Sequence, residues 1–182
     1  HICCHEGPGS LRIIVLDTSV FISACLGSGG ASRQALRLCL NRTCVPLMGE
    51  ALYTEHEAVL SRGRLFRDCA LDASERTALF EAYLSVCRWT RVYFSWRPNV
   101  PDESDNHVVE LAVAGGAEAI VTRNVRDFAR MEMRFSRLAV LDPREPHLDP
   151  REAPLAAVAG GMVRLEGAGF SRAPLTEVLV GG

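Results

Sequence analysis

Apolar residues recur along the chain in short continuous runs separated by longer segments with helical spacing. Residues 11–16 form a nearly continuous apolar run rich in β-branched side chains, which is typical of a strand buried on both faces. Similar runs predict further strands at residues 44–47, 92–96, 119–122 and 138–141.

The segments between these runs predict amphipathic helices. Apolar side chains have helical spacing over residues 33–40, 51–60, 72–87 and 104–114. The third of these segments opens with Asp72-Ala73-Ser74-Glu75, a capping-box arrangement, and the fourth is stopped by Gly115-Gly116. Because strands alternate with helices, we expect an α/β fold with a mostly parallel sheet and helices on both faces.

Length and local composition indicate how many domains the chain has and where the folded part begins and ends. A chain of 182 residues with 48% hydrophobic and 23% charged residues is ordinary for one globular domain. We expect a flexible leader at residues 1–10, a folded domain at 11–143, and a Pro-rich linker with a C-terminal extension of unknown role at 144–182.

Charge and cysteine content narrow the function classes. A formal net charge of −2 gives no global attraction to nucleic acid, so RNA binding would need a local basic patch. No apolar run approaches the roughly 20 residues of a membrane helix. Seven cysteines, an odd count, favour reduced thiols and a cytoplasmic protein over a disulfide framework.

Four acidic residues fall where a parallel sheet places its ligand site, beyond the carboxyl ends of the strands. Asp17 ends the first strand, and Asp127 follows the strand at 119–122 by a short loop. Asp105 opens a helix whose apolar residues lie three, four and seven positions later. Each of these aspartates could instead serve as a helix cap or turn residue.

Glu55 has only apolar neighbours three and four residues away on its helix, namely Ala51, Leu52, Ala58 and Val59. We therefore expect its carboxylate to face inward, where burial without a partner is costly. A buried salt bridge to an arginine is the alternative explanation. Glu57 has a mixed setting that calls for no special role.

Four carboxylates at one sheet edge repel one another unless a cation compensates their charge. All-oxygen ligands suit magnesium or manganese. Such an ion activates water and stabilises the charge on a phosphate under attack. The sequence therefore predicts metal-dependent phosphodiester hydrolysis by Asp17, Glu55, Asp105 and Asp127.

Four segments, in order, resemble the motifs of PIN-domain ribonucleases. The first is Val15-Leu16-Asp17-Thr18-Ser19, continuing to Ala24; the others lie at residues 52–62, 102–112 and 120–128. The match covers roughly residues 11–143 and is closest to the toxin-like (VapC-type) PIN proteins of bacterial toxin–antitoxin pairs. The resemblance implies a three-layer α/β/α fold and an endoribonuclease that uses Mg2+ or Mn2+. It also implies a protein antitoxin partner and homodimers.

Two positions depart from the pattern of many PIN domains. Ser19 stands where many members have Asn, and its hydroxyl can still hold the loop or a metal-bound water. Asn124 stands where many have an acid, so either Asp127 or Asn124 completes the metal site. Thr18 and Thr122 are further supporting residues of these motifs.

Arginines flank the acidic positions in the sequence. Arg62 and Arg64 follow the helix that carries Glu55, and Arg123 and Arg126 lie beside Asp127. As a group they predict a basic rim of phosphate contacts around the acidic centre, although each alone could be a solvated surface residue.

The sequence also bears on three other functions. An aspartyl-nucleophile phosphatase needs a second Asp where Ser19 stands. The glycines at residues 27–30 come a helix's length after the first strand, which excludes a dinucleotide-binding turn. A catalytically silent PIN-like module that binds RNA or a protein remains the alternative.

Overall fold

The computed structural model describes residues 11–27, 30–93, 105–128 and 138–144, and the backbone of residues 158–159 and 162–163. The predicted leader at 1–10 and most of the extension at 144–182 therefore lie outside the described residues. Within them, no helix is long and apolar enough to cross a membrane. The five cysteines of the described residues form no disulfide with one another.

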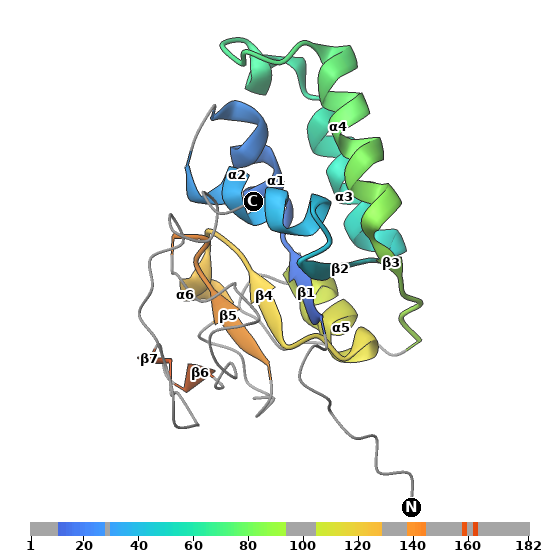
Figure 1. Cartoon of the computed structure of the whole chain (residues 1–182), viewed down its shortest axis with the longest axis vertical. Helices are drawn as coiled ribbons and strands as arrows, with labels where there is room; N and C mark the ends of the chain where they lie inside the picture. Colours follow the sequence, from blue (N-terminus) through green and yellow to red (C-terminus); the bar gives the residue numbers. More distant parts are fainter. Residues whose placement is uncertain are drawn as a thin grey trace, which may run out of the picture.

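A five-stranded parallel sheet forms the centre of the molecule (Figure 1). Its strands are β1 (Arg12–Leu16), β2 (Cys44–Met48), β3 (Arg88–Trp89), β4 (Ala119–Val121) and β5 (Ala139–Leu141), in the order β3-β2-β1-β4-β5. Every neighbouring pair is parallel, which confirms the predicted sheet. Two further short strands, β6 (Val158–Ala159) and β7 (Met162–Val163), pair with each other in antiparallel fashion.

Helices cover both faces of this sheet. They are α1 (Thr18–Leu26), α2 (Ala31–Leu40), α3 (Glu50–Leu60), α4 (Ala73–Val86), α5 (Asn106–Gly115) and α6 (Val125–Phe128), with a 3₁₀ helix η1 (Gly63–Phe66). Helices α2 and α4 contact β2, whereas α5 contacts β1, β2 and β4. Because the strand order reverses after β3, right-handed connections place α5 and α6 on the opposite face. The result is the three-layer α/β/α fold, with α5 set apart from α1–α4 in Figure 1.

Local sequence signals explain several element ends. The predicted capping box at the start of α4 is present, with Asp72 and Glu75 each accepting a hydrogen bond from the other's backbone N–H. Gly116 ends α5 in the left-handed conformation, with φ of 65°, which costs glycine little. At Gly115 a β-carbon would overlap the side chain of Leu47, so glycine allows α5 to approach β2 closely.

The strand predicted at residues 92–96 is wrong where the structure describes it. Val92 and Tyr93 are not in a strand, and residues 94–96 lie outside the described part. Helix α4 ends at Val86, and the extended backbone of Cys87 leads the chain directly into pairing with β2. The sheet edge is therefore the earlier segment Arg88–Trp89.

Candidate active site

Asp17 lies at the carboxyl end of β1, the strand from which the sheet extends to β2 on one side and to β4 on the other. It directly follows β1 and precedes α1, and its backbone N–H donates to the carbonyl of Val121 at the end of β4, at 3.0 Å. The chain leaves β1 toward β2 on one side, while β4 returns on the other. In open parallel sheets such a switch point opens a crevice that binds ligands.

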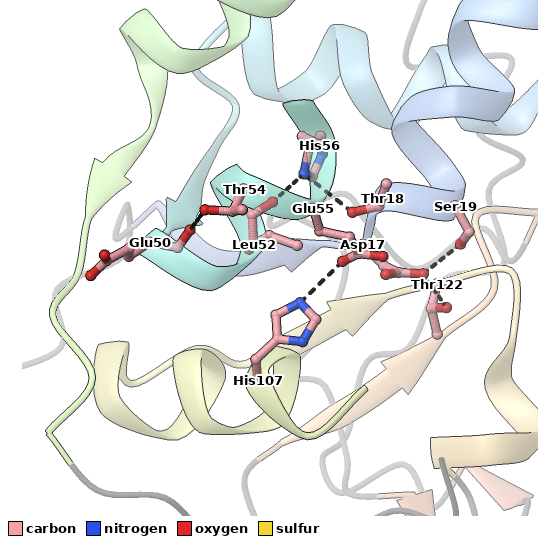
Figure 2. A network of polar contacts seen from close by, with 10 residues as sticks. All are labelled: Asp17, Thr18, Ser19, Glu50, Leu52, Thr54, Glu55, His56, His107 and Thr122. Carbon is pink, nitrogen blue, oxygen red and sulfur yellow. Dashed lines mark hydrogen bonds and ion pairs between the residues drawn. The ribbon is translucent and has the colours of Figure 1, made fainter. Parts of the chain in front are cut away.

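Two hydroxyl groups hold the carboxylate of Asp17 in one orientation (Figure 2). Ser19 Oγ donates to Asp17 Oδ2 at 2.5 Å, and Thr122 Oγ1 donates to the same oxygen at 2.8 Å. Thr122 is fully buried, and its hydroxyl also accepts from the backbone N–H of Asn124 at 3.0 Å. Because both bonds go to Oδ2, Oδ1 accepts no hydrogen bond from any described residue. The side chains of the first and fourth motifs thus form one hydrogen-bonded unit.

Glu55 lies on α3 beside Asp17, but it is less buried than its neighbours in the sequence suggested. Its side chain is 38% exposed. Two of the apolar neighbours used for the prediction, Ala51 and Ala58, are exposed, whereas Leu52 and His56 are buried. The carboxylate of Glu55, which the sequence predicted to face inward, is therefore only half-buried and lies at the edge of the buried face of α3. Burial of two small alanine side chains contributes too little to set the orientation of the helix.

His107 on α5 holds the carboxylate of Glu55. The distance from His107 Nε2 to Glu55 Oε2 is 3.1 Å, and Figure 2 shows the ring pointing from α5 toward α3. Burial acts to raise the pKa of Glu55, but hydrogen bonds from His107 and Thr18 outweigh it and lower the pKa below its ordinary value. Glu55 is accordingly held as a carboxylate. The partner is a histidine, not the arginine considered as an alternative.

His56 is a buried histidine that sequence reasoning missed. It is fully buried and stacks on Phe80 with ring centroids 5.3 Å apart. Its Nδ1 lies 2.8 Å from the carbonyl oxygen of Leu52 and 3.2 Å from Thr18 Oγ1. The carbonyl can only accept, so Nδ1 carries the proton. Burial lowers the pKa of His56, and the neutral ring thereby supports the turn that carries Thr18.

Three of the four predicted acids line a single cavity of about 410 Å³. Asp17 comes from the end of β1, Glu55 from α3, and Asp105 from the residue preceding α5. Thr18, Ser19, Arg123 and Asn124 line the same cavity. The edge of the sheet thus brings together acids as far apart in the sequence as Asp17 and Asp105, which are 88 positions apart.

A family model described as PIN domain matches residues 13–126. The chain belongs to the PIN-domain family. The matched region contains β1 except its first residue, all of β2 to β4, and every residue that lines the acidic cavity. No curated protein sequence matches the chain.

A solved structure shares the fold of this PIN domain. It is a chain of VapBC2 from Rickettsia felis, crystallised with a DNA fragment from the promoter of the pair, with a TM-score of 0.51 and 14% sequence identity. The similarity covers 72% of the present chain and 98% of the other. At this identity the likeness concerns the fold alone.

The fourth motif of this PIN domain presents Asn124 to the cavity. Asn124 is among the cavity-lining residues, whereas Asp127 lies on α6 outside that lining. Asn124 Nδ2 donates to Asp127 Oδ2. The amide nitrogen is thereby engaged, and Oδ1 of Asn124 remains as an oxygen acceptor. Asp127 as fourth carboxylate stays a prediction, and its observed contact is with Asn124.

The oxygen-rich lining fits a hard divalent cation by its chemistry. Carboxylates of Asp17, Glu55 and Asp105 with the amide oxygen of Asn124 are the ligands that magnesium and manganese prefer. Among the described residues, no three His, Cys, Asp or Glu side chains are grouped closely enough to hold an ion together. Three like charges around one cavity repel one another, and Glu55 pairs with His107 instead.

The predicted basic rim is partly visible. Arg123 lines the acidic cavity and is exposed. Arg62 and Arg64 are exposed on either side of η1's first residue, and Leu65 of η1 lines the cavity. Arg126 is exposed on α6. Phosphate binding by these arginines stays a prediction.

Proposed function

We propose that this PIN domain is a magnesium- or manganese-dependent endoribonuclease that hydrolyses RNA phosphodiester bonds. The observation that carries the proposal is the convergence of Asp17, Glu55 and Asp105 on one cavity at the switch point of the sheet. Carboxylates brought together from three separate elements carry a repulsive cost that a structural role does not explain. Binding of a divalent cation at this place would offset it.

The side chains of the cavity have distinct tasks in this proposal. Asp17, Glu55 and Asp105 would hold the metal, with Asp127, or Asn124 oriented by Asp127, completing the set. When bound, the ion lowers the pKa of water and stabilises the negative charge that develops on the phosphate. Ser19 and Thr122 fix Asp17 so that Oδ1 is available. His107 keeps Glu55 ionised and pointed at the cavity.

Arg123 completes the site as a phosphate contact. It is exposed and lies on the lining of the cavity, where a guanidinium can bind two phosphate oxygens at once. With Arg62, Arg64 and Arg126 it would provide the positive field that the chain as a whole lacks, since its net charge is −2.

We further propose that the protein is the toxin of a toxin–antitoxin pair, with a cognate antitoxin as partner, a homodimeric state and a cytoplasmic location. The motifs resemble those of VapC-type toxins, and the fold is shared with a chain of the Rickettsia felis VapBC2 complex. Co-purification of the chain with the product of an adjacent small gene tests the antitoxin partner.

Binding of Mn2+ to the full chain, followed by titration calorimetry, tests the metal site separately from catalysis. The wild-type chain should bind, and Asp17→Asn should bind at least tenfold more weakly because it loses a charged ligand. Glu57→Gln is the matched control, since Glu57 is exposed on the same helix as Glu55 and its carboxylate accepts a hydrogen bond from the Tyr53 hydroxyl. Unchanged binding in Asp17→Asn, or none in the wild type, contradicts the site and favours a catalytically silent binding module.

A further inference from the structure

A second cavity of about 440 Å³ adjoins the acidic one. The two share Ser23, Leu26 and Arg123 on their linings, so Arg123 stands between them. The second cavity contains none of the predicted metal ligands. Its remaining wall is formed by the start of α2 and by the segment after β5.

The start of α2 points unsatisfied backbone donors at this cavity. Gly30 is the N-cap residue, and no side chain caps the helix. Gly30, Ala31 and Ser32 all line the cavity. The N–H groups of Ala31 and Ser32 lie in the first turn and have no acceptor within the helix. No acidic residue occupies that turn, so the partial positive charge of this ten-residue helix is not neutralised.

Ser32 provides an independent indication of a ligand. Ser32 as a whole is only 8% exposed, and its hydroxyl makes no hydrogen bond to any described residue. The hydroxyl oxygen is not sealed from solvent, since it is not among the buried polar atoms that lack a partner. Because Ser32 lines the cavity, its hydroxyl is available to donate a hydrogen bond to a molecule bound there.

The charges around the cavity favour an anion. Arg123 and Arg144 face a single carboxylate, Asp142. Arg144 Nε donates to Asp142 Oδ1 at 2.8 Å and Arg144 Nη2 donates to Oδ2 at 2.7 Å. This bidentate pair neutralises Asp142, and the hydrogen bonds from Arg144 lower the pKa of Asp142 so that the pair persists. Arg123 then remains as the net positive charge.

We propose that the first turn of α2, with Ser32 and Arg123, binds a phosphodiester group of the RNA chain next to the one positioned for cleavage. The inference rests on the proposed function, because it assigns a second phosphate of the same substrate. Helix N-termini with free N–H groups are well suited to phosphate. Arg123 lies on both linings, so it lies between the two successive phosphates.

RNA binding by a charge-reversal variant tests the subsite. In the full-length chain carrying Asp17→Asn, which should not cut, Ser32→Asp places a carboxylate at the second residue of α2, where an acid favours the helix itself. We expect the affinity for a fluorescent single-stranded RNA to fall about tenfold. The log–log salt dependence should become shallower by about one unit, as for one lost phosphate contact.

Matched variants separate this effect from general causes. Ser74→Asp makes the same change at the second residue of α4, an exposed position, and should leave affinity within about twofold of the parent. Ser32→Ala removes only the hydroxyl and should weaken binding about threefold, the equivalent of one modest hydrogen bond. Should Ser32→Asp fail to fold, Ser32→Ala decides. Equal affinity and salt dependence of the Ser32 and Ser74 variants overturns the proposal.

RNA in which one phosphodiester is replaced by an uncharged linkage distinguishes a phosphate of the RNA chain from free inorganic phosphate. An RNA with one methylphosphonate linkage, moved along the chain, should weaken binding of the parent at one position, should weaken the Ser32→Ala variant less there, and should leave the Ser32→Asp variant unaffected there. If no position behaves in this way and inorganic phosphate alone competes in a Ser32-dependent manner, the site binds free phosphate and the RNA assignment is wrong. Wild-type chain that fails to cleave while Ser32 variants lose RNA affinity would refute the proposed reaction and support the subsite.

Discussion

Thr122→Val should show how strongly the orientation of Asp17 depends on one buried hydroxyl. Valine has nearly the shape of threonine, so packing is preserved at this fully buried position. Two hydrogen bonds are lost, the one to Asp17 Oδ2 at 2.8 Å and the one from the N–H of Asn124 at 3.0 Å. A hydrogen bond to a charged group contributes roughly 1.5–3 kcal/mol, and an unsatisfied buried donor adds to the loss.

We therefore expect the free energy of unfolding to fall by about 2–3 kcal/mol, measured by urea denaturation without metal. For a domain of this size that lowers Tm by roughly 5–10 °C. RNA cleavage should fall at least about tenfold, because Asp17 is no longer held in one orientation. Thr122→Ser keeps the hydroxyl and is the matched control for both measurements.

A double-mutant cycle isolates the contact between the two side chains. When Asp17→Asn is already present, Thr122→Val loses a hydrogen bond to a neutral amide in place of the one to a carboxylate, while the bond from the Asn124 N–H is lost in both backgrounds. The substitution should then cost about 1 kcal/mol less than in the wild type. If Thr122→Val and Thr122→Ser are equally stable and equally active, the hydroxyl does not orient Asp17, and the reasoning is refuted.

Three further predictions follow from the site and its surroundings. Glu55→Gln should reduce cleavage at least about tenfold, whereas Glu57→Gln should leave it unchanged; the reverse result would contradict the placement of α3. Arg62→Ala with Arg64→Ala should weaken binding of all RNA sequences and flatten the salt dependence by roughly one unit per lost contact, with kcat less affected than KM; equal affinity and salt slope would refute the rim. Burial lowers the pKa of His56. Below about pH 6.5 the imidazole of His56 is therefore protonated in the unfolded chain to a greater extent than in the folded chain. Stability should therefore fall between pH 7 and pH 5.5 in urea melts, and His56→Phe should fall less steeply; equal slopes would contradict this account.

The sequence was sufficient where one strong local signal determined the structure. A short apolar run rich in β-branched residues is typical of a strand buried on both faces of a parallel sheet. Strand β1 accordingly begins within one position of the predicted start. Asp17 then lies at the carboxyl end of the strand by geometry alone. The same reasoning places the strand before Thr122, although the hydrogen bond between the two residues joins positions 105 apart and cannot be derived from local pattern.

Helix α3 shows why the buried face of a helix was harder to predict than the position of a strand. Apolar spacing marked Ala51, Leu52, Ala58 and Val59 as the inner face. Of these Leu52 is buried and Val59 is partly buried, but Ala51 and Ala58 are exposed, and His56 is the other buried residue of the helix. A histidine is counted as polar in any hydrophobic pattern, yet its ring packs among aromatic side chains that arrive from α1 and α4. Its position four residues after Leu52 was the only signal available.

Cleavage of RNA by the full-length chain tests the central claim most directly. Structured and unstructured RNA should be incubated with and without Mn2+, using wild-type chain, Asp17→Asn and Asp105→Asn purified in parallel. The account predicts endonucleolytic products only with metal and only from the wild type, with all three chains equally folded. Metal-dependent cleavage that persists in either variant, or its absence from the wild type, would contradict the assignment of these carboxylates as a nuclease centre.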